Sequence, residues 1–146
     1  RQRRRVSDHV AEEFAATVFE AEGAVDVLHN NAGIGHGGNI EATTPEDWRR
    51  IIDVNLLGVA YGVQAFVPRM LRQGRPASVV NTASQLGLMP SANTAPYCAS
   101  KYGVVGLSEA LNAEISKRAA REALRVITSS YEYHGGFRLR TVAARA

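Results

Sequence analysis

The sequence predicts an α/β domain in which helices alternate with the strands of a parallel sheet. Short apolar segments of strand length alternate with longer segments whose apolar residues recur every three or four positions. This alternation is typical of units in which a helix connects two parallel strands. The 146 residues, 45% of them hydrophobic, are enough for one domain with a buried core.

The first part of the chain predicts a helix and then a strand. The helix follows Ser7, whose hydroxyl can cap it, and it stops at Gly23. Residues 25–30 are short and apolar, as expected of a buried strand. Because glycines crowd the segment that follows, the strand is predicted to run directly into a loop.

The remaining elements continue the alternation. A second helix is predicted from Pro45, because Thr44 can cap it and proline suits the first helical position. Pro68 should kink or end this helix, and Gly74 should end it in any case. We then expect a strand over residues 78–82, a loop over 84–95, a helix over 96–119 and a strand over 124–128.

Charge and cysteine content argue against several classes of protein. The formal net charge is +3, but residues 1–5 carry four arginines, whereas residues 6–130 carry ten basic and thirteen acidic side chains. Because the body of the chain is mildly acidic, nucleic-acid binding is disfavoured. No apolar run approaches the ~18 residues of a membrane helix, so no membrane partner is expected. Cys98 is the single cysteine, so we expect no intrachain disulfide, no metal site and a cytoplasmic location.

A glycine-rich segment imitates a dinucleotide-binding motif. Residues 33–38 satisfy the spacing G-x-G-x-x-G after a predicted strand, and Asp53 follows twenty residues after the first glycine. That motif requires its third glycine to open a helix whose N-terminus faces a pyrophosphate. Here five residues separate Gly38 from the cap of the next helix, and Asp53 falls inside that helix. We therefore interpret the segment as a glycine-rich loop past a strand end.

Tyr97 and Lys101 form a chemical signal, because a spacing of four places them on one face of a helix. An ammonium beside a phenol lowers the pKa of the tyrosine, which then exchanges protons nearer to neutral pH. Ser84 follows a predicted strand, thirteen residues before Tyr97, where a parallel sheet places its ligand loops. Asn55 is a polar residue on an otherwise apolar helix, and we expect its amide to bind helix backbone and water.

Four short motifs together resemble the middle of a short-chain dehydrogenase/reductase. They match in order and spacing over about residues 7–125, and they are Asn30-Asn31-Ala32-Gly33, Asp53-Val54-Asn55, Val80-Asn81-Thr82-Ala83-Ser84 and Tyr97-Cys98-Ala99-Ser100-Lys101. The resemblance implies a Rossmann-like parallel sheet with helices on both faces. It also implies that this sheet is incomplete, with the first strands and the last strand missing. NAD or NADP would be the cofactor, and a small alcohol or carbonyl compound the substrate.

The resemblance further implies a role for each matching residue. Tyr97 is the general acid and base, and Ser84 hydrogen-bonds the substrate carbonyl or hydroxyl. Lys101 binds the nicotinamide ribose and tunes Tyr97, while Asn55 holds the water of a proton relay. In a full-length version, the second and third helices are expected to pair in a homo-oligomer. The residues implied to lie along the cofactor's ribose are Asn30, Ala32 and Gly33, and Tyr97 is implied to bind the cofactor together with Lys101.

Both ends of the chain depart from the family pattern. Residues 1–6 are predicted to be an irregular basic segment, residues 7–128 a partial dehydrogenase domain and residues 129–146 an irregular tail. The family's first strand and glycine-rich phosphate loop, which anchor the dinucleotide, have no counterpart in this sequence. Two alternatives to an enzyme stay open. One is a truncated or frame-disrupted remnant that cannot hold the dinucleotide, and the other is a nucleic-acid binder driven by the terminal arginines.

Overall fold

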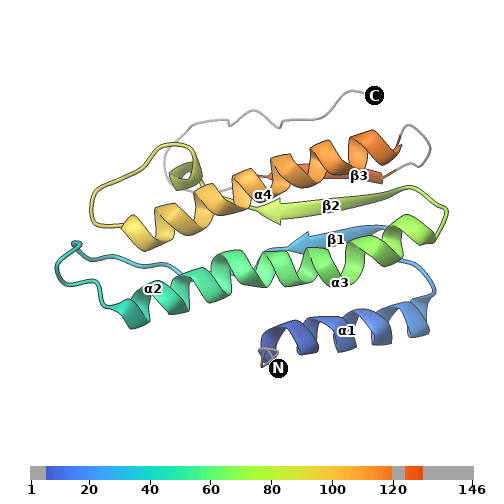
Figure 1. The fold of residues 1–146 in the computed structure, drawn as a ribbon, viewed down its shortest axis with the longest axis horizontal. Helices are drawn as coiled ribbons and strands as arrows, with labels where there is room; N and C mark the ends of the chain where they lie inside the picture. The colour runs from blue at the N-terminus through green and yellow to red at the C-terminus, as the bar shows by residue number, and fades with distance from the viewer. Residues whose placement is uncertain (1–5, 120–123, 130–146) are drawn as a thin grey trace.

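The computed structural model describes residues 6–119 and 124–129, and its elements follow the predicted order (Figure 1). They are α1 (Val6–Glu22), β1 (Val27–Asn30), α2 (Pro45–Ile52), the π-helical turn η1 (Asp53–Leu57), α3 (Gly58–Arg72), β2 (Ala77–Thr82), the 3-10 turn η2 (Gln85–Gly87), α4 (Ala95–Ala119) and β3 (Leu124–Ser129). Because α1 begins at Val6, Ser7 lies inside its first turn and does not precede it. The predicted irregular ends were each one residue too long, because Val6 belongs to α1 and Ser129 to β3, and the rest of both segments lies outside the described residues.

The three strands form one parallel sheet in the order β1-β2-β3. Val27 pairs with Ser78 and Asn30 with Asn81, and β2 pairs with β3 in the same parallel sense. The predicted α/β class with a parallel sheet is therefore confirmed. Since the strands point the same way, their carboxyl ends lie along one edge, where the loops that lead to α2 and α4 begin (Figure 1).

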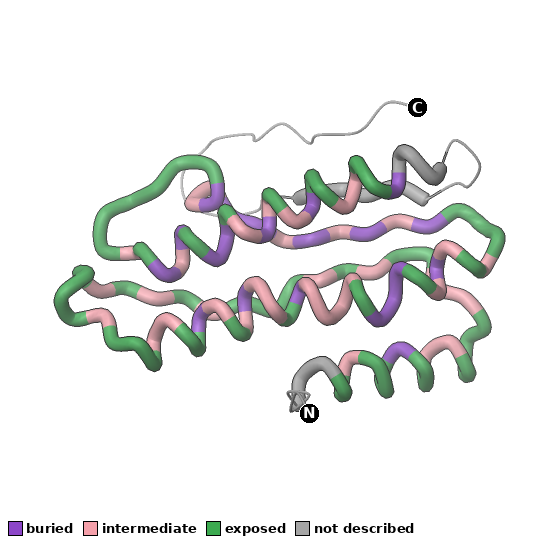
Figure 2. Tube along the Cα trace, viewed as in Figure 1, coloured by how far each residue is buried: buried purple, intermediate pink, exposed green. Residues whose placement is uncertain are grey.

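The core lies between the sheet and the helices α1, α3 and α4. Alternate residues of β2 are buried (Figure 2), and Val79 is fully enclosed in a cluster with Ala15 of α1, Phe66 of α3 and Ile115 of α4. The resemblance implies helices on both faces, whereas the helices in the described part of the chain all pack on the face that Val79 occupies. The opposite face carries exposed Val27, since successive residues of a strand point to opposite sides.

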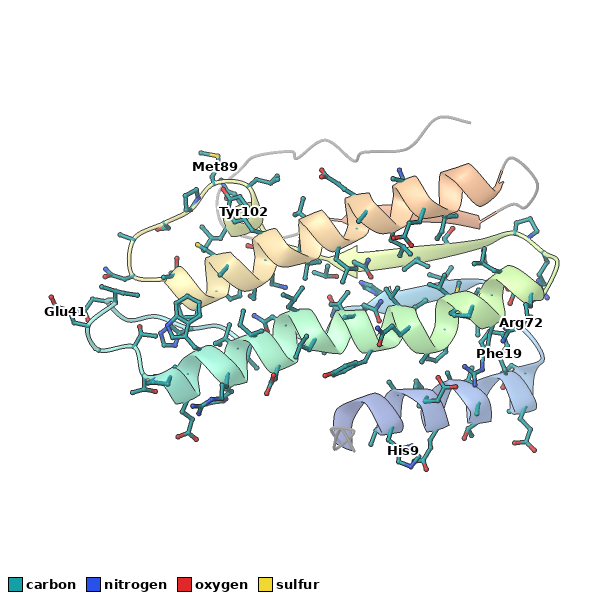
Figure 3. The ribbon with its side chains drawn as sticks, in the orientation of Figure 1. His9, Phe19, Glu41, Arg72, Met89 and Tyr102 are labelled. Carbon is teal, nitrogen blue, oxygen red and sulfur yellow. The ribbon has the colours of Figure 1, made fainter. Side chains whose placement is uncertain are left out.

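Aromatic rings and one ion pair join α1 to α3. The ring of Phe66 lies 5.8 Å from that of Phe14 and 6.1 Å from that of Phe19, which extends from α1 toward α3 (Figure 3). Arg69 donates to the Glu12 carboxylate at 2.7 Å, and this hydrogen bond raises the pKa of the guanidinium above its ordinary value. These contacts hold α1 beside the helical layer that carries the site.

The elements α2, η1 and α3 form one continuous helical run. Thr44 and Asp47 form a reciprocal capping box at its start, which extends the predicted cap. The expectation that Pro68 could end the helix is wrong, because α3 continues past it to a C-cap at Gln73. Proline removes one backbone hydrogen bond, but Met70 and other buried residues on both sides of it keep the helix packed.

The same helical run, residues 45–72, is long and apolar enough to cross a membrane by length and composition alone. Its qualifying 18-residue window has a mean hydropathy of 1.4, and 33% of that window is buried inside the protein. By this criterion of length and hydropathy, the sequence prediction that no apolar run approaches the length of a membrane-spanning helix does not hold. Core helices of soluble proteins meet the same criterion, and α3 contributes Phe66 and Met70 to the core, so the span is weak support for a membrane segment.

Candidate active site

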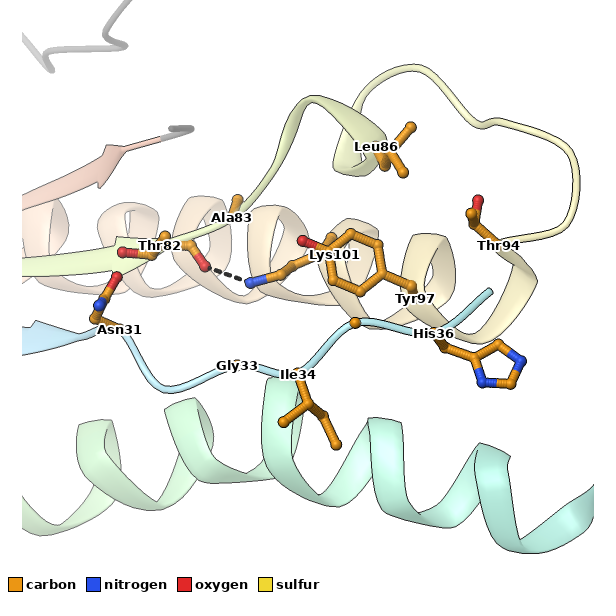
Figure 4. Close-up of a pocket in the computed structure, with 11 residues that line it drawn as sticks. Asn31, Gly33, Ile34, His36, Thr82, Ala83, Leu86, Thr94, Tyr97 and Lys101 are labelled. Atoms are coloured by element: carbon orange, nitrogen blue, oxygen red, sulfur yellow. Dashed lines mark hydrogen bonds between the residues drawn. The ribbon is translucent and has the colours of Figure 1, made fainter. Parts of the chain in front are cut away.

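A pocket of about 460 Å³ opens at the carboxyl edge of β1 and β2, against the first turns of α4 (Figure 4). Its volume lies in the range of small-molecule sites in proteins. The segment after β1 forms one wall, and the end of β2 with the turn that follows it forms another. The lining residues are Asn31, Gly33, Ile34, Gly35, His36, Thr82, Ala83, Leu86, Thr94, Tyr97 and Lys101. A parallel sheet is expected to place a ligand at this edge.

Tyr97 and Lys101 lie together in the pocket wall, as their spacing on a helix predicts (Figure 4). The Lys101 ammonium is 5.7 Å from the centre of the Tyr97 ring. Lys101 is 4% exposed, and its Nζ donates a hydrogen bond of 3.0 Å to the main-chain carbonyl of Thr82. Because this carbonyl holds the buried cation in place, the phenol of Tyr97 has a stationary positive charge beside it.

Asn55 is fully buried in η1, and its partners differ from those expected. Its protein partner is not helix backbone but the loop after β1: its Oδ1 accepts from the Ile34 amide at 2.8 Å, and its Nδ2 donates to the Ile34 carbonyl at 2.9 Å. The Nδ2 also donates to Ser100 Oγ at 3.1 Å. The π-helical turn that carries Asn55 is a geometry frequent at functional sites. Asn55 therefore ties one wall of the pocket to α4.

Ser84 follows β2 as predicted, but it is fully buried and is not among the residues that line the pocket. Its hydroxyl accepts a hydrogen bond of 3.1 Å from the Leu86 amide and so caps η2. The neighbouring side chains of Ala83 and Leu86 face the pocket instead. Since the Leu86 amide uses a lone pair of the hydroxyl, Ser84 keeps its own proton as a donor.

The three residues expected along the cofactor's ribose take different positions. Gly33 lines the pocket, and a side chain there would lie 3.5 Å from the Nζ of Lys101. Ala32 is exposed and lies outside the lining residues. Asn30 is directed toward the helix layer, where its Nδ2 donates to Asn81 Oδ1 at 2.8 Å. Gly33 thus leaves the space beside Lys101 open, while Asn30 joins the ends of two strands.

Sequence reasoning missed several polar residues of the pocket. Asn31 and Thr82 directly follow or end a strand, so their place at the carboxyl edge was readable from the pattern. His36 and Thr94 lie on loops, whose path no local pattern predicts. The expectation that residues 33–38 form a loop, with the next helix starting later, is confirmed, because α2 begins at Pro45.

Metal-ligating side chains do not gather at this site. Within residues 6–119 and 124–129, no three His, Cys, Asp or Glu side chains are placed to share a metal ion. Cys98 is buried, and its sulfur lies 3.2 Å from the hydroxyl of Thr94. The pocket therefore offers a phenol, an ammonium, amides and hydroxyls, a set suited to proton exchange and hydrogen bonding.

Sequence comparison finds relatives over most of this chain. A model of the family described as short chain dehydrogenase matches residues 5–128. The chain is similar to an NADPH-dependent pterin aldehyde reductase of Arabidopsis thaliana, with 38% identity over 119 residues, and to cyclohexanol dehydrogenase of Acinetobacter sp. (strain SE19), with 43% identity over 112 residues. These matches cover 81% and 76% of this chain but 49% and 43% of the relatives. The chain thus spans about half the length of the curated relatives it matches.

Comparison of folds gives the same result. A short chain dehydrogenase/reductase from Burkholderia phymatum, solved in complex with NAD, matches with a TM-score of 0.80 and 38% sequence identity. The match covers 86% of this chain and 44% of that one. The motifs, the parallel sheet and the relatives therefore all point to one family.

Proposed function

Because this chain belongs to the short-chain dehydrogenase family, we propose that it carries the acid–base residues of an NAD(P)-dependent oxidoreductase that interconverts an alcohol and a carbonyl compound. The observation that carries the proposal is the meeting of Tyr97 and Lys101 in a pocket at the carboxyl edge of the sheet. The volume of about 460 Å³ suits a small alcohol or carbonyl substrate beside one end of a cofactor.

Tyr97 is the group proposed to exchange a proton with the substrate oxygen. The ammonium of Lys101 favours the phenolate form, and the Thr82 carbonyl keeps that ammonium in place. Reduction of a carbonyl draws the proton from the Tyr97 hydroxyl, and oxidation of an alcohol returns it. Ser84 is proposed to donate a second hydrogen bond to the same oxygen. Since Ser84 is buried, this contact requires η2 to shift when the substrate binds.

The pocket fits the nicotinamide ribose end of a dinucleotide. Gly33 leaves open the space beside Lys101 that a side chain would occupy, and Asn31 and Lys101 offer donors to ribose hydroxyls. When bound, the cofactor supplies or accepts the hydride. The main chain of Ala32 is proposed to lie along the ribose, while Asn30 contributes by joining β1 to β2.

Asn55 is proposed to take part in the proton relay. Both hydrogens of its Nδ2 are engaged, one by the Ile34 carbonyl and the other by Ser100 Oγ. A relay water would therefore bind an oxygen of Asn55 and not its amino group.

Two measurements on the purified chain test this function. Titration with NADH and with NADPH, followed by nucleotide fluorescence, should show micromolar binding of at least one of them. Tyr97→Phe keeps the ring and removes the proton, so it should abolish most alcohol turnover and leave the nucleotide affinity nearly unchanged. Tyr61→Phe is the matched control, because Tyr61 lies on α3 outside the lining residues. Undiminished turnover in Tyr97→Phe would overturn the assignment.

A second candidate is a non-catalytic remnant that keeps the family fold without holding the dinucleotide. The observation that favours it is the placement of Asn30 and Ala32, neither of which lines the pocket although both are expected along the cofactor's ribose. It predicts no fluorescence change with either nucleotide and no turnover with a panel of small secondary alcohols.

We also propose that the protein acts as a cytoplasmic homo-oligomer, paired through its helices as the family resemblance implies, with no nucleic-acid partner. Size-exclusion chromatography with light scattering tests the oligomer, and a monomer at all concentrations would contradict it. Salt-dependent binding to a DNA duplex would contradict the absence of a nucleic-acid partner.

A further inference from the structure

Helix α4 carries two serines with the same hydrogen-bond pattern. Ser100 Oγ donates to the carbonyl of Tyr97 at 2.7 Å and accepts from Asn55 Nδ2 at 3.1 Å. Ser108 Oγ donates to the carbonyl of Val104 at 2.7 Å and accepts from Asn81 Nδ2 at 3.0 Å. Both serines are fully buried, so each makes its two hydrogen bonds away from water.

A serine that bonds back to its own helix is common, but here each hydroxyl also receives a donor from another element. Asn55 reaches Ser100 from the long helical run, and Asn81 reaches Ser108 from β2. The helix is thus held at two points, one directly before Lys101 and the other seven residues after it. A hydrogen bond is directional, so each link fixes a position along and around the helix axis more narrowly than apolar packing does.

The two links differ in what they join to α4. Through Asn55, the Ser100 link continues to both main-chain groups of Ile34, which lines the pocket. At its other end, this link terminates on the carbonyl of Tyr97 itself. The Ser108 link continues through Asn81 to Asn30, and neither of these asparagines lines the pocket. Only the Ser100 link therefore connects one wall of the pocket to the proposed acid–base residue.

We propose that Ser100 is a positioning residue that holds the Tyr97 main chain and the Ile34 segment in fixed relation through Asn55. This inference rests on the proposed function in one respect, the role of Tyr97 as the proton-exchanging group. Ser100 itself is not proposed to touch either the substrate or the cofactor. Its loss loosens the first turn of α4, so Tyr97 spends more time away from the Lys101 ammonium.

The matched pair Ser100→Ala and Ser108→Ala tests the proposal in the full chain. Each variant removes one fully buried hydroxyl from α4 and leaves one asparagine donor without its acceptor, so the two should lower the melting temperature by similar amounts. The readout that separates them is the titration of Tyr97, followed by NMR with tyrosine labelled with carbon-13 at Cζ. The chain has five tyrosines, and Tyr97→Phe identifies the resonance of Tyr97.

Ser100→Ala is expected to raise the pKa of Tyr97 by about half a unit, a roughly threefold change in its acid dissociation constant. Ser108→Ala is expected to leave it where it is in the parent chain. A second readout, hydrogen exchange of the Ile34 amide, should become about tenfold faster in Ser100→Ala alone, because Asn55 loses one of its anchors. If both variants behave alike in both readouts, the serines are equivalent structural contacts and the proposal is overturned.

The remaining outcomes also support or overturn the proposed role of Ser100. An unchanged Tyr97 titration with faster Ile34 exchange would confine Ser100 to the loop and overturn its link to Tyr97. If Tyr97 of the parent chain titrates like a free tyrosine, the activation of Tyr97 by Lys101 and the proposed function fail, whereas Ile34 exchange still tests separately whether Ser100 holds the Ile34 segment. Should Ser100→Ala not fold, Ser100→Cys and Ser108→Cys provide the same comparison, with a thiol that fills the space of the hydroxyl but hydrogen-bonds only weakly.

Discussion

Among the glycines in the described part of the chain, Gly62 of α3 has the least room for a side chain. A Cβ added there would lie 2.3 Å from Oδ1 of Asn30, far inside the contact distance of the two atoms. That asparagine cannot swing aside freely, because its Nδ2 donates to Asn81 Oδ1 at 2.8 Å. Gly62→Ala must therefore both strain the packing of α3 on β1 and break this hydrogen bond between the strand ends.

The size of the effect follows from three contributions to the free energy of unfolding. Losing the bond to the fully buried Asn81 leaves a polar atom unsatisfied, which costs about 1–3 kcal/mol. Forcing a methyl group into the packed contact between α3 and β1 costs about 1–3 kcal/mol more. Alanine regains about 1 kcal/mol over glycine inside a helix. The net destabilisation is about 1–5 kcal/mol, or a fall of about 3–15 °C in the melting temperature at this chain length.

Thermal unfolding followed by circular dichroism measures this fall, and Gly106→Ala is the matched control. Gly106 is an exposed position inside α4, where an added Cβ meets nothing within 4 Å, so this variant should be slightly more stable than the parent. In an Asn30→Ala background the clash is absent, and Gly62→Ala should then be nearly neutral or stabilising. A melting temperature of Gly62→Ala equal to that of the parent would refute the contact between α3 and β1 described here.

Three further predictions concern the site and its supports. Asn55→Leu keeps the side-chain volume but leaves both main-chain groups of Ile34 without their partner, so urea unfolding should show that the free energy of unfolding falls by about 2–4 kcal/mol. An unchanged free energy of unfolding would contradict the two hydrogen bonds between Asn55 and Ile34. Gly87→Ala would place a Cβ 2.8 Å from the main-chain oxygen of Lys101, which cannot rotate aside as a side chain can, so we expect weaker nucleotide fluorescence and a lower melting temperature, unlike in Gly106→Ala. Hydrogen bonds from the hydroxyl and amide of Thr44 hold the pKa of the Asp47 carboxyl below its ordinary value, so this contact stabilises the fold above about pH 4 and is lost as the pH falls further. Thr44→Ala should therefore have a lower melting temperature than the parent at pH 7, and this difference in melting temperature should be smaller at pH 2–3. A difference that does not change with pH would show that the ionised carboxylate of Asp47 does not contribute to the stabilisation.

The elements were predictable from sequence because local patterns decide them. Residues 78–82 were expected as a strand and β2 spans Ala77–Thr82; residues 96–119 were expected as a helix and α4 spans Ala95–Ala119. The pairing of Tyr97 with Lys101 needed only the helical spacing of four. The match of the short chain dehydrogenase model to residues 5–128 confirms the resemblance carried by the four motifs.

The partners of the buried polar residues were not predictable in the same way. Asn55 bonds to Ile34, twenty-one residues away, because the loop after β1 runs along the helix, and no local pattern predicts that path. The continuation of α3 past Pro68 depends on tertiary packing that outweighs a local preference. The direction of the Asn30 side chain, however, could have been predicted from the sequence. Strand alternation places it on the same side as Leu28, which packs against the core, and register places it beside Asn81.

Directional polar contacts and apolar packing have different roles in this domain. The cluster around Val79 gathers apolar residues of three helices and can supply most of the stability, but apolar contacts do not fix a side chain to tenths of an ångström. Around the pocket, the fixed points are instead the Thr82 carbonyl that holds Lys101, the Asn55 amide that binds Ile34, and Ser100 of α4. Each such satisfied contact contributes only about 0.5–1.5 kcal/mol net, whereas removing one partner costs more. The buried polar groups near the site are therefore better explained by the geometry they impose on Tyr97 and Lys101 than by stability.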